Sequence, residues 1–166
     1  MDFKTSDGIR INYYIYGTGK PVVLIHGFGG YQQIWCLQIE NLIQQGYQVI
    51  TYDQRNHGAS TRDEQLDSIE PLIKDLYELL NHLNVTKPFL IGHSMGASVI
   101  YGFLSYYTDF PLSGVIAIDQ SPKMFNTVQW PYGYMDITRA SYKLKLKEHG
   151  NVRERLNGVP SQVISK

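Results

Sequence analysis

The segment 92–96, with the sequence Gly-His-Ser-Met-Gly, is the part of this chain best suited to covalent chemistry. It fits the pattern G-x-S-x-G, in which a serine lies on a tight turn between a strand and a helix. The apolar run 89–91 precedes it and a helical pattern begins at Met95. Such a turn projects the hydroxyl of Ser94 above a sheet, at a helix N-terminus whose dipole favours developing negative charge. Ser94 is therefore predicted to be a nucleophile, and the alternative is a bystander serine in a glycine-rich turn.

A second glycine-rich segment, 26–30, follows the apolar run 22–25. Acyl transfer needs two backbone N–H groups aimed at the oxyanion of the tetrahedral intermediate. The amides of Phe28 and Met95 are the predicted donors. A phosphate-binding loop or a plain turn is the alternative, but the spacing does not match G-x-G-x-x-G and no P-loop lysine follows.

Residues around these groups are predicted to line a substrate pocket: His26, Gly27, Gly29 and His93. The two histidines lie inside motifs with backbone roles, which makes them poor candidates for a general base. A general base must lie within hydrogen-bond reach of the serine hydroxyl. His149 is the only histidine beyond residue 119, and its place at the end of a charged helix argues against that role.

A third segment, 53–60, reads Asp-Gln-Arg-Asn-His-Gly-Ala-Ser. In this order the three segments resemble the α/β-hydrolase superfamily, whose corresponding loop is D-x-R-G-H-G-x-S. Asn56 replaces a glycine, a mild departure because asparagine tolerates left-handed backbone angles. The resemblance covers residues 1 to about 122. It implies mainly structural roles for Asp53, Arg55 and His57.

The resemblance also suggests where the acid of a catalytic triad lies, because the family's order is nucleophile, acid, histidine. Many members place the acid one strand later than Asp119, while a subset resembles the present arrangement. Asp119 follows the apolar run 115–118, and ligands bind at this edge of a parallel sheet. It is a candidate triad acid, or else a loop-capping or substrate-side aspartate. The family's histidine follows the last strand, which is not present here, so a C-terminally truncated chain is expected.

Hydrophobic periodicity predicts the elements that position these groups. Strands are expected at 3–5, 9–15, 22–25, 49–52, 89–91 and 115–118, and helices at 31–45, from a cap at Asp67 or Ser68 through 83, and at 95–107. Alternating strands and helices indicate an α/β fold with a mainly parallel sheet and helices on both faces. The resemblance narrows this to the α/β-hydrolase type without its last strands.

Two regions follow from the change in character after residue 122. Residues 1–122 are predicted to form the hydrolase core. Residues 123–166 resemble the start of a helical lid followed by a tail, with one amphipathic helix expected at 136–149.

Composition limits the classes of partner. The 166 residues carry 15 basic and 15 acidic side chains, without the basic excess of a nucleic-acid binder. Cys36 is the only cysteine, so neither an internal disulfide nor a metal-ligand spacing can be built from it. No cofactor or metal is implied. A cytoplasmic protein is expected, because the sequence shows no secretion signal and no stretch of about 20 apolar residues.

The predicted function is hydrolysis of a small-molecule, ester-like substrate through an acyl-serine. Amidases, thioesterases, peroxidases and some lyases share this apparatus. A serine in place of an aspartate at position 94 argues against haloalkane dehalogenase and epoxide hydrolase chemistry. A non-catalytic homologue that binds a small molecule and an inactive fragment are the two competing hypotheses, because the catalytic histidine is missing.

Overall fold

The computed structural model describes residues 1–133 and 137–141. The chain divides into two compact units, Met1–Gln120 and Ser121–Lys166. The first unit ends two residues before the predicted boundary. Of the helix predicted at 136–149, the structure describes residues 137–141, and 139–141 are helical.

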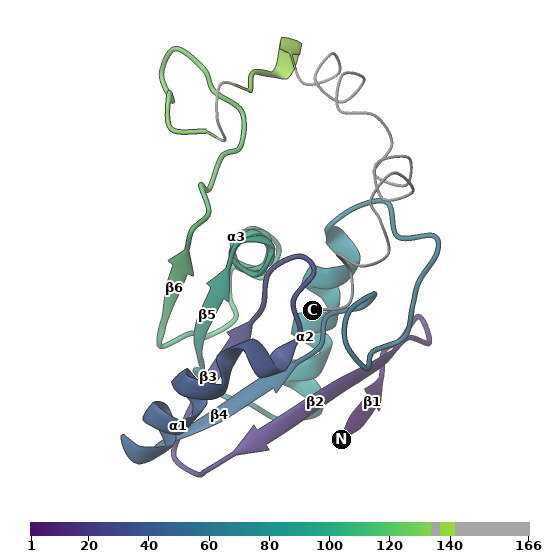
Figure 1. Ribbon diagram of the computed structural model, residues 1–166, viewed down its shortest axis with the longest axis vertical. Coiled ribbons are helices and arrows are strands. Elements are labelled where there is room, and N and C mark those ends of the chain that lie inside the picture. Colours follow the sequence, from purple (N-terminus) through teal and green to yellow (C-terminus); the bar gives the residue numbers. More distant parts are fainter. Residues whose placement is uncertain (134–136, 142–166) are drawn as a thin grey trace, which may run out of the picture. The chain divides into compact units, whose positions relative to one another are not determined.

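The sheet of the first unit has six strands in the order β1-β2-β4-β3-β5-β6 (Figure 1). The strands are β1 (Asp2–Lys4), β2 (Arg10–Tyr16), β3 (Lys20–Ile25), β4 (Tyr47–Tyr52), β5 (Phe89–His93) and β6 (Gly114–Ile118). Strand β2 is antiparallel to β1 and to β4, whereas β4, β3, β5 and β6 run parallel. The predicted mainly parallel α/β-hydrolase sheet is confirmed.

Three α-helices connect these strands: α1 (Cys36–Gln44), α2 (Glu70–His82) and α3 (Met95–Tyr106). The single helix predicted at 31–45 is in fact a 3-10 helix, η1 (Gln32–Trp35), followed by α1. The predicted cap on α2 was wrong as well, because its N-cap is Ile69 and no side chain caps it. Proline at position 71 lacks one of the first-turn amides that a cap would satisfy.

Alternate side chains of β3 show how the helices cover the sheet. Val23 and Ile25 belong to a buried cluster with side chains of α2 and α3. Val22 and Leu24 point to the other face, where they pack against Trp35 and the apolar side of α1. A strand that is apolar on both faces is therefore covered on both faces, as its continuous apolar run indicates.

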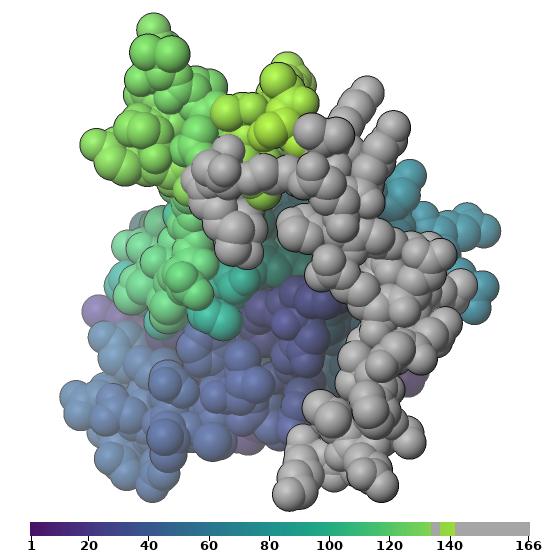
Figure 2. Space-filling view, turned by 45° about the horizontal axis from the view of Figure 1, so that its top comes forward, coloured from purple at the N-terminus to yellow at the C-terminus, as the bar shows by residue number. Residues whose placement is uncertain are grey.

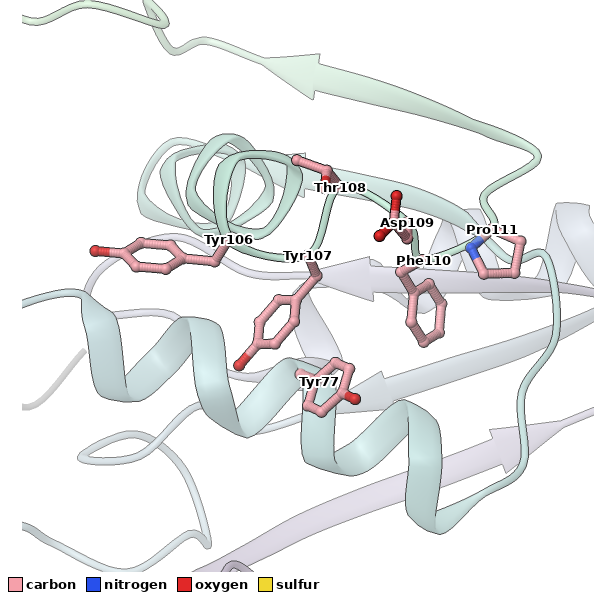
Figure 3. A pocket seen from close by; sticks show the side chains of 7 residues that line it. All are labelled: Tyr77, Tyr106, Tyr107, Thr108, Asp109, Phe110 and Pro111. Carbon is pink, nitrogen blue, oxygen red and sulfur yellow. The ribbon is translucent and has the colours of Figure 1, made fainter.

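Aromatic packing joins the middle of α2 to the C-terminal end of α3 and the residues that follow it. The rings of Tyr77 and Tyr107 are stacked with centroids 4.0 Å apart, and Phe110 meets Tyr77 edge-on at 6.1 Å. These three rings line one cavity of about 370 Å³ together with Tyr106, and Figure 3 shows the side chains around it. The cavity contains none of the residues predicted to carry chemistry.

The described part of the second unit is organised around Trp130. Its indole Nε1 donates a hydrogen bond to the carbonyl oxygen of Lys123 over 3.1 Å, and its backbone pairs with Thr127. Its ring meets that of Tyr132 edge-on. Across the described residues of both units, no helix combines the length and apolarity needed to span a membrane.

Candidate active site

Ser94 occupies the corner between β5 and α3. Its backbone angles, φ 50° and ψ −117°, lie in a region that residues with a side chain rarely adopt. Its N–H donates to the carbonyl oxygen of Ile118 over 2.9 Å, which ties the corner to the end of β6. Its own carbonyl oxygen accepts from the amides of Ala97 and Ser98, which starts the helix. The serine therefore lies at a strained strand-to-helix turn outside the regular helix.

The glycines on each side of the serine allow three backbone segments to meet. A Cβ on Gly92 would lie 2.5 Å from the carbonyl carbon of Gly96. A Cβ on Gly96 would collide with the carbonyl oxygen of Ile25 at the end of β3. Both positions require glycine because the backbone of the turn at 92–96 packs directly against other backbone segments.

The turn after β3 begins beside the serine. A Cβ on Gly27 would lie 3.2 Å from the Cβ of Ser94 and 3.0 Å from Nδ1 of His93. The amide of Gly30 donates to the carbonyl oxygen of Gly27 over 3.1 Å and closes a four-residue turn. Phe28, whose amide is a predicted oxyanion donor, occupies the second position of that turn. Its side chain is 81% exposed.

His26 supports this turn from below and does not take the pocket-lining place predicted for it. The residue is fully buried, and its two ring nitrogens contact the backbone. Nδ1 lies 2.8 Å from the carbonyl oxygen of Gly27, and Nε2 lies 3.0 Å from the amide nitrogen of Gln54. Since a carbonyl only accepts and an amide only donates, the proton is on Nδ1 and the ring is neutral. Burial lowers the pKa of His26, in keeping with that neutral form.

The 53–60 loop braces the same turn. The carboxylate of Asp53 accepts from the amide of Gln32 and from the amide of Ala59, each over 2.8 Å. Nε2 of His57 accepts from the amide of Gly29 over 3.1 Å. Through these contacts the segment 53–60, called the scaffold loop below, fixes the turn after β3.

Arg55 anchors the scaffold loop to the rest of the unit. Its guanidinium is 2% exposed and forms ion pairs with Asp75 at 2.6 Å, Asp7 at 2.9 Å and Asp63 at 3.0 Å. Burial alone would lower the pKa of Arg55, but the hydrogen bonds with Asp75 outweigh it and raise that pKa. The guanidinium therefore stays charged and holds together α2, the scaffold loop and the turn between β1 and β2.

Asp119 lies directly after β6, at the sheet edge where Ser94 also lies. Its φ is 54° and its side chain is 85% exposed. Its Oδ2 is 4.0 Å from Nε2 of His93, whose side chain is 40% exposed. The position suits a carboxylate that orients another group near the serine, and its role as triad acid stays a prediction.

A cavity of about 420 Å³ adjoins the predicted oxyanion donors. Phe28 and Met95 both line it, together with His57. The remaining lining consists of Asn56, Leu66, Asp67, Ser68, Ile69 and Leu72. In Figure 2 the indigo surface of the turn after β3 meets the teal-green surface of the chain around β5. The volume falls within the range of small-molecule pockets, about 300 to 1,000 Å³.

The described residues do not supply a general base for Ser94. Among the described residues, no side chain forms a hydrogen bond with the Ser94 hydroxyl, and both ring nitrogens of His26 and His57 contact the backbone. His149 lies outside the described residues. Within that same part of the chain, no three histidine, cysteine or acidic side chains gather as a metal site would require.

The supporting roles of two buried residues, Asp75 and Gln32, are not predicted from the sequence. No link between Asp75 and Arg55 is predicted there, although an acidic residue among the apolar positions 72, 76 and 79 of one helix face signals a buried ionic partner. Gln32 is buried, donating its side-chain amide to Asn12 and accepting from Thr51. No sequence signal pointed to Gln32, because its partners lie on strands far away in the chain.

Comparison with known proteins places this geometry in a family. Residues 20–142 match the family model described as alpha/beta hydrolase fold. A putative non-heme chloroperoxidase from Synechocystis sp. is 36% identical over 104 residues, which is 63% of this chain and 38% of that protein. Epoxide hydrolase A from Mycobacterium tuberculosis is 35% identical over 97% of this chain and 52% of its own length.

Among solved structures, a carboxylesterase from Nitrososphaera gargenis superposes with a TM-score of 0.71 at 32% sequence identity. The match covers 76% of this chain and 47% of that one. The chain therefore spans about half the length, or less, of these three proteins.

Proposed function

The chain belongs to the alpha/beta hydrolase fold family, and on that premise we propose that it hydrolyses small carboxylic esters through an acyl-serine on Ser94. The observation that carries the proposal is the backbone of Ser94, with φ 50° and ψ −117° at the corner between a strand and a helix. Strain of this kind persists only where surrounding structure imposes it, and it concentrates at functional sites. Gly27, beside the serine, begins the turn that carries Phe28, whose amide is one of the two proposed oxyanion donors.

The proposed reaction proceeds in two stages. The Ser94 oxygen attacks the ester carbonyl while a base takes its proton, and the amides of Phe28 and Met95 donate to the oxyanion. Collapse of the tetrahedral intermediate expels the alcohol, which receives that proton. Water then attacks the acyl-serine and releases the acid. Asp119 is proposed to orient a histidine base, which is not among the described residues.

Ester hydrolysis is preferred over the chemistries of the other relatives for two reasons. The carboxylesterase likeness of 32% identity supports it directly. Position 94 holds a serine, whereas epoxide opening in this family uses an aspartate there. The cavity beside Phe28 and Met95 has a mainly apolar floor from Leu66, Ile69 and Leu72, which suits an uncharged acyl chain.

Binding without catalysis is the second candidate function. It is favoured by the Ser94 hydroxyl, to which no described side chain is hydrogen bonded. In that case the 420 Å³ cavity would hold a small molecule and no acyl-enzyme would form.

A fluorophosphonate probe with intact-mass readout separates the two. We expect one adduct per chain on the wild-type protein and none on S94A. Ser98, one helical turn further on α3, provides the matched control, and S98A should label like the wild type. A folded wild-type chain that takes up no probe would favour the binding role and contradict the hydrolase proposal.

A further inference from the structure

His57 connects the scaffold loop with the turn that carries Phe28. Its Nε2 accepts the Gly29 amide over 3.1 Å, and its Nδ1 lies 3.0 Å from the carbonyl oxygen of Arg55. A carbonyl oxygen only accepts a hydrogen bond and an amide only donates one. The two partners therefore fix His57 as a neutral ring with its proton on Nδ1.

The Gly29 amide is the group that decides the form of the turn. Residues 27–30 close through the hydrogen bond from Gly30 to Gly27, and Gly29 has a φ of 72° at the third position. A positive φ there is the mark of a type II turn, whereas type I has a negative φ. The two types differ mainly by rotation of the peptide between Phe28 and Gly29. A hydrogen bond from that peptide to His57 therefore selects type II.

The ring of Phe28 makes a second contact with the same histidine. The two ring centroids are 5.7 Å apart at an interplanar angle of 83°, an edge-to-face arrangement. Both side chains also line the 420 Å³ cavity. His57 thus contacts Phe28 in two ways. Its ring packs against the ring of Phe28, and its Nε2 accepts from the peptide N–H between Phe28 and Gly29.

We propose that His57 is a positioning residue for the turn at 27–30 and that it acts only as the neutral ring. A proton on Nε2 would replace the acceptor with a donor facing the Gly29 N–H, so the hydrogen bond would be lost and the turn released. Because Gly27 lies beside Ser94, the change would reach the oxyanion donor of Phe28. That consequence for Ser94 rests on the proposed function, whereas the effect on the turn does not.

Several titratable or charged groups surround the ring. His26 is one of them, and its ring centroid lies 5.1 Å from the ring centroid of His57. The Asp53 carboxylate accepts from the amide of Ala59 on the same loop, and Asp67 lines the same cavity. The Arg55 guanidinium is directed to its own carboxylate partners. An H57Q variant separates the titration of His57 from that of these neighbours, because glutamine keeps an acceptor oxygen and does not titrate.

The first test uses NMR on the full chain labelled with 15N-glycine. In the wild type the Gly29 amide resonance should move with the same midpoint as the ring nitrogens of His57. In H57Q the resonance should stay in place as the pH falls. In H57F, which keeps a ring against Phe28 and removes the acceptor, it should be displaced at every pH. H82F serves as control, because His82 is exposed and lies on α2.

The second test measures the rate of fluorophosphonate labelling at Ser94. We expect H57F to label at least about tenfold more slowly than the wild type, since small displacements of a catalytic group cost up to a hundredfold. H57Q should recover most of the rate and lose the acid sensitivity that His57 imposes. An unlabelled wild type would contradict the proposed function, and the NMR test would still decide the role of His57.

A Gly29 resonance that is the same in H57F and the wild type, with the same pH response, would overturn the proposal. If H57F does not fold, the wild-type titration and H57Q decide it alone. A Gly29 resonance in H57Q that still follows pH like the wild type would also overturn it.

Discussion

Burial of His26 should make the stability of the first unit depend on pH. The ring is fully buried and its nitrogens face one carbonyl oxygen and one amide, so burial lowers its pKa below the ordinary value of about 6.5. Below about pH 6.5 the unfolded chain binds a proton that the folded chain does not. The free energy of unfolding therefore falls as the pH decreases through this value, down to the lowered pKa.

Urea unfolding at several pH values between about 5 and 8 measures this effect. His26 should contribute a slope of up to about 1.4 kcal/mol per pH unit, with stability rising toward high pH. H26Q should flatten the curve, since glutamine can accept from the Gln54 amide without titrating. An H26Q curve as steep as that of the wild type would contradict the assignment.

What could be predicted at this scale depended on whether a residue's partners are near in the chain. Ser94 was recognisable because its strand, turn and helix are contiguous, and the structure gives it the expected corner. The sequence neighbours of His26 predict a place in the pocket, but the residue is fully buried and its ring accepts from the amide of Gln54 in the loop at 53–60. The Arg55–Asp75 pair joins a loop and a helix face, a contact that spacing does not reveal.

At the scale of elements, the packing of α3 against β3 should be the feature least tolerant of change. A Cβ on Gly96 would collide with the backbone carbonyl of Ile25, which cannot move without displacing β3. A Cβ on Gly102, further along the same helix, would overlap Cδ1 at the end of the Ile73 side chain and lie 2.8 Å from its Cγ1. A side-chain end can change rotamer, whereas a central strand cannot shift cheaply.

G96A and G102A therefore form a matched pair. We expect G96A to lower the free energy of unfolding by about 3 kcal/mol or more, at the upper end of overpacking costs. G102A should change it by less than about 1 kcal/mol, because the helical preference of alanine offsets the repacking of Ile73. Chemical denaturation of both variants measures the difference. Equal losses would show that the contact between Gly96 and Ile25 is no less tolerant than the contact between Gly102 and Ile73.

Element boundaries were predictable where apolar periodicity is strong, as in the strands β3 and β5. The start of α2 was not, because the preference for a polar cap pointed to 67 or 68 while the helix begins at Glu70, next to Pro71. The apolar pattern at 31–45 predicts one helix, but its first part is the 3-10 helix η1. The periods of the two kinds of helix, about 3.0 and 3.6 residues per turn, cannot be told apart from the apolar pattern over one turn.

For the whole molecule, β6 is the exposed margin of the sheet. It is the last strand in the order of the described sheet, and all its residues except glycine are apolar. Val115, Ile116 and Ile118 are 41%, 51% and 39% exposed. Edge strands of this kind pair readily with other chains unless charges protect them. With 15 basic and 15 acidic side chains, the chain has no net charge to keep copies apart.

I116K should therefore reduce self-association of the chain. Ile116 borders a cavity of about 410 Å³ between β6 and α1, so a lysine there adds charge to the exposed face of the edge strand. V128K adds the same charge at a fully exposed position in the second unit and controls for net charge alone. Sedimentation velocity at several concentrations should show fewer large species for I116K than for V128K. The urea midpoint of I116K should stay close to that of the wild type, because half of the isoleucine is already exposed. Equal improvement by both substitutions would mean that net charge, and not the strand edge, governs association.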